Sequence, residues 1–289
     1  MYNYGMSNHI YFGDNLPFLR ELQAESVNLI YIDPPFNTGH TQSRMQISTE
    51  RSINGDRTGF AGQRYLTTKL GSRGYADIFD DYLDFITPRL EESRRVLAAD
   101  GSLYFHIDYR EAHYVKILLD TIFGRECFLN EIIWAYDYGG RTKRKFPPKH
   151  DTIFWYAKDP DNYTFNVDAL DRIPYMAPGL VGKEKAARGK LPTDVWWHTI
   201  VPTNSREKTG YPTQKPMGIL RRIITASSNP GEQVLDFFAG SGTTGAACLE
   251  LGRHFTLVDN NPQALEVMAK RFDGVEGIGW HGWQTGSNR

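Results

Sequence analysis

Seven short apolar segments recur along the chain and predict buried β-strands. Each is a nearly continuous run of aliphatic, β-branched and aromatic residues rather than an alternation of apolar and polar ones, and such runs are typical of strands covered on both faces. In chain order the segments are HIYFG (9–13), VNLIYID (27–33), SLYFHID (102–108), EIIWAY (131–136), DTIFWYA (151–157), QVLDFF (233–238) and HFTLVD (254–259).

Amphipathic segments lie between these runs and predict helices over 81–97, 110–123, 218–227 and 261–272. In the first of them, apolar residues fall near one face of a helix of 3.6 residues per turn. Strands that alternate with helices favour an α/β fold with a mostly parallel sheet. We therefore expect one substantial seven-stranded sheet.

Two stretches do not follow this alternation. Residues 37–76 are polar and glycine-rich, and we expect a long loop there, which in a compact domain is typical of a functional or a disordered segment. Residues 159–210 carry Pro, Gly, Trp and basic residues without clear periodicity. We interpret the second stretch as a small appended region.

Composition narrows the class of protein. The 289 residues are 40% hydrophobic, which is enough for a large core, and no stretch approaches the roughly 18 apolar residues of a membrane helix. The N-terminus lacks the pattern of a secretory signal, and two cysteines are too few for a disulfide scaffold. Neither cysteine lies in a CxxC, so we expect no metal site. The expected location is the cytoplasm.

The net charge of −1 requires any polyanionic partner to be met by local clusters of cations. The densest cluster contains Arg141, Lys143, Arg144 and Lys145. A second cluster occupies 183–190. Solvated surface is the ordinary explanation of such runs, and phosphate contact is the functional one.

A glycine-rich turn follows the predicted strand 233–238. Gly240, Gly242 and Gly245 fit G-x-G-x-x-G, and Asp259 lies 19 residues after the first glycine, at the end of the next strand. Glycines allow the backbone to approach a ligand, and an acid at that position accepts hydrogen bonds from ribose hydroxyls. The turn alone fits either a nicotinamide dinucleotide or S-adenosylmethionine, and Asp236, just before it, favours the latter.

The tetrapeptide Asp33-Pro34-Pro35-Phe36 directly follows the predicted strand 27–33. Two prolines stiffen the turn and leave its carbonyls without competing N–H groups. Asp33 and the carbonyl of Pro34 can each accept one hydrogen of an NH₂ group, and Phe36 can stack on a planar ring. Since loops past the carboxyl ends of parallel strands line the ligand crevice, this turn is a candidate receptor for a base that bears an amino group.

Together these segments resemble the site-specific DNA amino-methyltransferases of restriction–modification type, in the circularly permuted β group. IYIDPPFNTG resembles the catalytic motif of that family and VLDFFAGSGTT resembles its methyl-donor motif, in the permuted order. YPTQKPMGILRRII and IYFGDN are similar to the segments that precede these two motifs. The resemblance extends over nearly the whole chain.

The resemblance implies a Rossmann-like sheet of seven strands in the order 3-2-1-4-5-7-6. It implies a catalytic half at 1–158, which contains the loop 37–76, a target-recognition region at 159–210, and an S-adenosylmethionine-binding half at 211–289. The implied cofactor contacts are Asp14 near the adenine, Lys215 near the methionine carboxylate, Asp259 on the ribose, and Asp236, Phe238, Gly240 and Gly242. The implied catalytic residues are Asp33, Pro34, Pro35 and Phe36.

The implied reaction is methylation of the N6 amino group of a flipped-out adenine in double-stranded DNA. An acid as the first residue of the tetrapeptide favours adenine, and cytosine N4 is the alternative. A nicotinamide-dependent oxidoreductase and a non-catalytic DNA-binding protein are the hypotheses from other classes. Methylation at cytosine C5 requires a nucleophilic cysteine in an exposed turn, and neither Cys127 nor Cys248 has that setting. The expected partners are DNA and a cognate restriction endonuclease, with the chain a monomer or a homodimer and no membrane involved.

Overall fold

The computed structural model describes residues 7–51, 57–58, 64–77, 79, 81–140 and 142–283. Within these residues, the main sheet has nine strands. Their spatial order is β12 (Ile278–His281), β1 (Asn8–Phe12), β11 (His254–Asp259), β10 (Gln233–Asp236), β2 (Val27–Ile32), β6 (Leu97–Ile107), β8 (His150–Ala157), β7 (Phe128–Ala135) and β9 (Val195–Trp197).

The sequence-based count of seven strands is wrong for this sheet. All seven predicted segments form strands, but β12 and β9 extend its two edges. β9 holds only three residues and β12 contains a glycine, so neither is an apolar run that the sequence pattern could reveal. The strands from β12 to β6 are parallel, whereas β8 is antiparallel to both β6 and β7, so the sheet is mixed.

Helices cover both faces of the sheet, which explains the continuous apolar runs. In β2, Leu29 and Tyr31 belong to the core on one face, and Ile30 and Ile32 belong to the core on the other. The first core includes residues of α5 (Met217–Ser227), α6 (Thr243–Leu251) and α7 (Pro262–Arg271). The second includes residues of α1 (Asn15–Glu21), α2 (Tyr82–Val96) and α3 (Ala112–Phe123). The four predicted helices are confirmed as α2, α3, α5 and α7.

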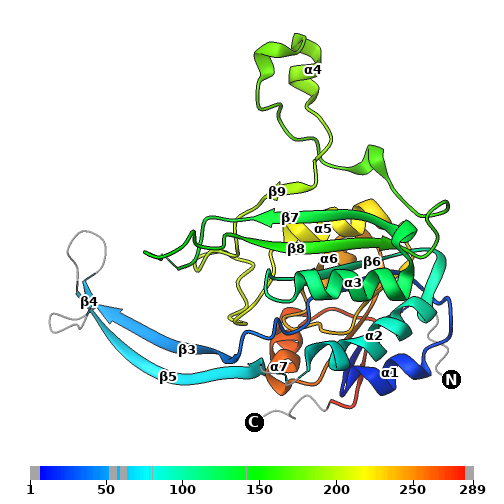
Figure 1. The fold of residues 1–289 in the computed structure, drawn as a ribbon. Coiled ribbons are helices and arrows are strands. Elements are labelled where there is room, and N and C mark those ends of the chain that lie inside the picture. Colours follow the sequence, from blue (N-terminus) through cyan, green and yellow to red (C-terminus); the bar gives the residue numbers. More distant parts are fainter. Residues whose placement is uncertain are drawn as a thin grey trace.

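Segment 37–76 is not the long loop that its composition predicts. β3 (His40–Arg51), β5 (Arg64–Asp77) and the short β4 (Arg57–Thr58) form an antiparallel three-stranded sheet that projects from the body (Figure 1). An antiparallel ladder is held by backbone hydrogen bonds, so polar strands leave little apolar signal. At its base, the buried Asp77 carboxylate accepts hydrogen bonds from Asn37 N at 2.7 Å and Thr38 Oγ1 at 2.6 Å.

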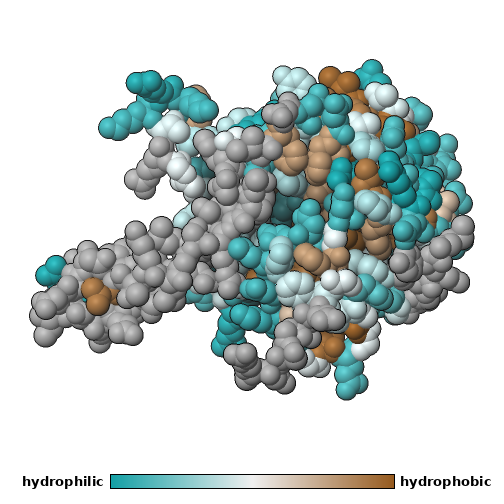
Figure 2. Space-filling model, turned by 90° about the horizontal axis from the view of Figure 1, so that it is seen from below, coloured by the Kyte–Doolittle hydropathy of each residue, from teal (hydrophilic) through white to brown (hydrophobic). Residues whose placement is uncertain are grey.

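Residues 159–210 hold only short elements. These are the 3₁₀ turns η3 (Val167–Ala169) and η4 (Pro178–Leu180), the helix α4 (Lys183–Arg188) and β9. Beyond β9, the part around α4 extends away from the sheet (Figure 1). On the face shown in Figure 2, hydrophobic side chains are scattered among hydrophilic ones. No helix in the described part of the chain is long and apolar enough to cross a membrane.

Candidate active site

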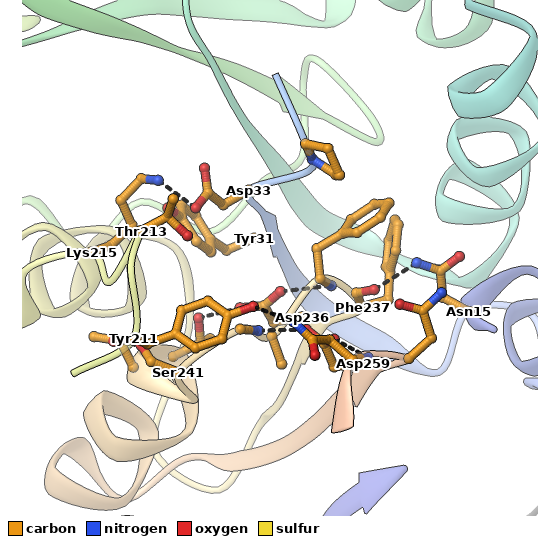
Figure 3. Close-up of a pocket in the computed structure, with 18 of the residues that line it drawn as sticks. Asn15, Tyr31, Asp33, Tyr211, Thr213, Lys215, Asp236, Phe237, Ser241 and Asp259 are labelled. Carbon is orange, nitrogen blue, oxygen red and sulfur yellow. Dashed lines mark hydrogen bonds and ion pairs between the residues drawn. The ribbon is translucent and has the colours of Figure 1, made fainter. Parts of the chain in front are cut away.

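A cavity of about 320 Å³ opens at the carboxyl ends of β1, β11, β10 and β2. Each of these four neighbouring strands ends in or just before an acid, and all four acids line the cavity: Asp14, Asp259, Asp236 and Asp33. Pro35, Lys215, Phe238 and Gly240 also line it. Eight of the sequence-predicted residues therefore meet in one place. Figure 3 shows Asp33, Lys215, Asp236 and Asp259 among them.

The glycine turn is held to the strand ends by the two central acids. Asp259 Oδ2 accepts a hydrogen bond from Gly240 N at 2.8 Å, and Gly240 has φ +51°, in the left-handed region. Asp236 accepts from Phe238 N at 3.1 Å and from Thr244 Oγ1 at 2.5 Å. The turn thus presents Gly240 and Phe238 to the cavity.

Gly242 and Gly245 lie beneath the turn, where neighbouring side chains leave no room for a Cβ atom. Gly242 does not line the cavity, and a Cβ atom there would lie 2.8 Å from Met268 Cγ of α7. At Gly245 a Cβ would lie 2.8 Å from Leu257 Cδ1 of β11. The second and third glycines of the motif therefore allow close packing beneath the turn, and Gly240 alone of the three faces the cavity.

Burial gives the two central carboxylates unusual acid–base properties. It raises the pKa of Asp236 from 3.8 to about 7, and the hydrogen bonds from Thr244 and Phe238 offset only part of this rise. It also raises the pKa of Asp259 to about 6. A cavity whose acids are costly to ionise favours ligands that bring positive charge or hydroxyl donors.

Asp33 lies at the end of β2, and its two oxygens have different surroundings. Oδ2 forms an ion pair with Lys215 Nζ. Oδ1 is buried and has no hydrogen-bond partner in the described part of the chain. A buried carboxylate oxygen without a donor is costly, so Oδ1 is the atom that a bound amino group can satisfy.

The other residues of the tetrapeptide are less exposed to the cavity. Pro35 lines it, whereas Pro34 and Phe36 are not among the lining residues. The Phe36 ring lies beneath Lys215, with Nζ 5.0 Å from the ring centroid, and 5.8 Å from the ring of His106. Stacking of Phe36 on a base stays a prediction.

Lys215 lines the cavity beside Asp33. Its ammonium group forms an ion pair with the Asp33 carboxylate at the carboxyl end of β2 (Figure 3). A place near the methionine carboxylate stays a prediction. The segment that holds Lys215, residues 211–215, crosses the cavity ahead of α5, and Tyr211 and Thr213 also line it. Lys215 therefore reaches Asp33 from the segment that precedes α5.

Sequence reasoning missed two polar groups around the cavity. Arg89 of α2 donates to Asn15 Oδ1 at 2.6 Å and to Asp14 Oδ1 at 3.0 Å, which fixes the loop after β1. His106 of β6 is fully buried behind Asp33 and contacts Tyr31 and Asp151. Both residues occur inside segments that the pattern assigned to a helix and a strand, so nothing marked them as different from core or surface residues.

The predicted phosphate-binding cluster lies on the loop between β7 and β8. Lys143, Arg144 and Lys145 are exposed there, and Arg141 lies outside the described residues. Lys145 Nζ is 5.9 Å from the centroid of the Tyr109 ring. The role of these cations in DNA binding stays a prediction.

The glycine turn and an acid whose Oδ1 has no hydrogen-bond partner among the described residues thus share one cavity at the carboxyl ends of the strands of an α/β fold. The chain belongs to the N6/N4 DNA methylase family, whose match spans residues 27–271. It is accordingly a DNA methyltransferase, as the sequence resemblance implies.

Two named relatives illustrate the family. The type II methyltransferase M.HpaI of Haemophilus parainfluenzae is 31% identical over 255 residues, which is 88% of this chain and 71% of the relative. The DNA adenine methyltransferase YhdJ of Escherichia coli is 31% identical over 274 residues, which is 90% of this chain and 81% of the relative.

Solved structures share the fold at lower identity. The PvuII cytosine-N4-specific DNA methyltransferase has a TM-score of 0.62 at 16% identity, with 92% of this chain and 86% of that chain covered. The complex of M1.HpyAVI with SAM has a TM-score of 0.59 at 19% identity, with 92% and 98% covered.

Proposed function

We propose that this protein transfers the methyl group of S-adenosylmethionine to the N6 amino group of an adenine in double-stranded DNA. The observation that carries the proposal is the buried, unpartnered Oδ1 of Asp33 in the same cavity as Gly240 and Asp259. Asp33, which can accept a hydrogen bond from an amino group, thus lines the same cavity as the glycine turn, which can bind a nucleoside.

The donor set of the cavity fits S-adenosylmethionine. Its sulfonium and ammonium groups bring positive charge to a cavity lined by four acids, and its ribose hydroxyls can donate to Asp259. Asp14 and Phe238 would hold the adenine end, and Asp236 and Gly240 the middle. When bound, the cofactor supplies an electrophilic methyl group.

Asp33 and the Pro34 carbonyl would act on the nucleophile. The lone pair of an exocyclic amino group is conjugated with the ring, so the nitrogen is a weak nucleophile. Hydrogen bonds from NH₂ to these two acceptors favour a tetrahedral nitrogen and direct its lone pair toward the methyl group. The contribution of the protein is then position and electrostatic stabilisation of the charge that develops on nitrogen.

The target base would have to leave the duplex. The amino group is inaccessible to a buried carboxylate while the base is stacked, and flipping costs a few kcal/mol. Lys143 and Arg144 are exposed on the loop that joins β7 and β8. These two cations are suited to bind DNA phosphates while the base is flipped out.

Adenine is favoured over cytosine by the acid at position 33 and by the name of the relative YhdJ, a DNA adenine methyltransferase. Cytosine N4 is the alternative, because a neighbour in fold, PvuII, is cytosine-N4-specific. A cysteine nucleophile has no support, because Cys127 and Cys248 are both buried and burial raises the pKa of each thiol.

The permuted organisation is also part of the proposal. The tetrapeptide at 33–36 precedes the glycine turn at 240–245, and we assign the catalytic half to 1–158, target recognition to 159–210 and cofactor binding to 211–289. The name of M.HpaI, a type II methyltransferase, supports a restriction–modification setting with an accompanying endonuclease.

The test is to express the chain in a host without adenine or cytosine methylation and to sequence its DNA for modified bases. N6-methyladenine at one short motif, absent with Asp33→Ala, is the expected result. N4-methylcytosine would select the alternative, and unmodified DNA from a host that makes the folded protein would refute the proposal.

A further inference from the structure

A series of four hydrogen-bonded polar side chains, three of them buried, runs across the sheet behind Asp33. Tyr31 Oη lies 2.9 Å from His106 Nδ1, and His106 Nε2 lies 3.1 Å from Asp151 Oδ2. The hydroxyl group of Tyr136 donates to the other oxygen of Asp151 at 2.9 Å. The four residues lie on or next to β2, β6, β8 and β7, so the series joins neighbouring strands.

The positions of the protons in this series of hydrogen bonds follow from the groups on either side of His106, which are Tyr31 and Asp151. Burial raises the pKa of Tyr31, and the nearby carboxylates raise it further, so its hydroxyl group stays protonated and donates to His106 Nδ1. The pKa of Asp151 lies below its ordinary value although burial acts to raise it, because hydrogen bonds and nearby positive charge outweigh burial. An ionised Asp151 only accepts, so His106 Nε2 donates to it, and a neutral imidazole then accepts from Tyr31 at Nδ1.

His106 Nδ1, which accepts from Tyr31, also lies near the reacting end of the site. His106 Nδ1 is 3.9 Å from Asp33 Oδ1, the carboxylate oxygen that has no hydrogen-bond donor in the described part of the chain. Closure by about 1 Å would bring the two atoms to hydrogen-bond distance, and catalytic hydrogen bonds commonly tighten in this way when substrate binds.

We propose that His106, oriented by Asp151, accepts the proton that the methylated amino group loses through Asp33. This inference rests on the proposed function. A histidine held by a carboxylate on one nitrogen and facing the reacting group with the other is the arrangement of a general base and its orienting acid.

The step balances as follows. The amino lone pair forms the new N–C bond while the electron pair of the S–C bond stays on sulfur, and the nitrogen becomes positively charged. As this charge develops, one N–H bond breaks in the same step and its electrons stay on nitrogen. The proton passes to Asp33 Oδ1 and on to His106 Nδ1, from which the Tyr31 hydroxyl hydrogen has turned away. The result is a neutral methylated amine and an imidazolium ion between two ionised carboxylates.

The surroundings favour this internal acceptor. His106 is completely buried and Asp33 Oδ1 has almost no contact with solvent, so bulk water is a poor competitor while DNA covers the site. The positive charge on His106 would be stabilised by Asp33 at 3.9 Å and by Asp151 at 3.1 Å. Tyr31 needs only to rotate its hydroxyl hydrogen in order to accept from Nδ1 instead of donating to it.

The competing explanation is that these four hydrogen-bonded side chains only support the sheet. Tyr136 separates the two explanations. It forms a hydrogen bond of similar length to the other oxygen of Asp151, and it does not line the cavity. Loss of that hydroxyl group removes structural support and leaves the path from Asp33 to Asp151 intact.

The experiment compares His106→Asn, Asp151→Asn and the matched control Tyr136→Phe with the wild-type protein. The substrate is bacterial DNA amplified in vitro, which is free of methylation, with methyl-labelled S-adenosylmethionine. Single-turnover rates are measured together with the cofactor dissociation constant, the KM for DNA and the melting temperature.

We expect the first two variants to lose about 100-fold or more in single-turnover rate, the range for a general base, with the dissociation constant and KM within about threefold of wild type. Tyr136→Phe should keep its rate within about threefold. The proposed proton transfer is refuted if His106→Asn or Asp151→Asn keeps the wild-type rate, or if Tyr136→Phe loses as much rate as Asp151→Asn. It is also refuted if neither His106→Asn nor Asp151→Asn folds, since the hydrogen-bonded side chains are then structural support. A wild-type protein that methylates no DNA would instead refute the proposed function.

Discussion

Asp236 is expected to destabilise the cofactor-free protein at neutral pH, and Asp236→Asn should therefore be more stable than wild type. Burial raises the pKa of this carboxyl group from 3.8 to about 7. Each pKa unit corresponds to about 1.36 kcal/mol. At pH 8 the group is ionised in both the folded and the unfolded state, so the raised pKa lowers the free energy of unfolding by about 4 kcal/mol. An acid that is costly to ionise in the empty site is expected where a ligand later brings positive charge.

An asparagine at position 236 can keep both hydrogen bonds of the Asp236 side chain and removes its negative charge. Its carbonyl oxygen can accept from Phe238 N, and its amide can donate to Thr244 Oγ1, which acts as donor or acceptor. The substitution therefore tests the cost of ionisation rather than the loss of hydrogen bonds.

The sign of the pH dependence follows from the direction of the shift. The folded protein holds the Asp236 proton more tightly than the unfolded chain, so wild-type stability falls as the pH rises from about 4 to about 7. Urea unfolding of the cofactor-free proteins should show an advantage of about 4 kcal/mol for Asp236→Asn at pH 8 and about 2 kcal/mol at pH 5. The exposed Asp273→Asn is the control. Equal stabilities at pH 8, or an advantage that does not shrink at pH 5, would refute the argument.

Three further predictions concern the roles of the site. Asp33→Ala should lower methyl transfer at least about 100-fold and leave the calorimetric dissociation constant of S-adenosylmethionine within about threefold; substantial residual activity would remove Asp33 from the chemistry. Asp259→Ala should weaken cofactor binding by about 1.5–3 kcal/mol, the range for a hydrogen bond to a charged group, and an unchanged constant would exclude it from the site. Neutralising Lys143 and Arg144 together should weaken binding to target and non-target duplexes alike and lower the slope of log affinity against log salt by about 2. An unchanged slope would mean that the loop lies away from DNA, and loss of sequence preference alone would indicate base readout.

The local sequence pattern was sufficient to predict structure where a residue type has a single structural role. Asn261 followed by Pro262 predicts a helix start, and the Asn261 side chain accepts from Gln263 N at 3.0 Å at the first turn of α7. Similarly, the apolar runs predict strands covered on both faces, because both sets of alternate side chains reach a core.

Pattern failed where the same residue type serves two purposes. The glycine motif does not show that Gly242 packs on α7 while Gly240 faces the cavity, because both uses require a missing Cβ. His106 lies in an apolar strand segment, and only the pairing of β6 with β8 places it opposite Ile153 and within reach of Asp151. Long-range register of this kind has no local signal in one sequence.

The arrangement of the site depends on strand order rather than chain order. Asp33 and Asp236 are some two hundred residues apart in the sequence, yet β2 and β10 pair in parallel, with Leu29 beside Val234 and Ile30 beside Leu235. Parallel pairing brings the carboxyl ends of both strands to one edge, where the loops after them line one cavity. A chain that joined these strands in another order would build the same cavity, provided that the four acid-bearing strands stayed neighbours. The long segments between them, the β3–β5 sheet and residues 159–210, carry none of the four acids that line the cavity, and we expect DNA recognition to lie on them.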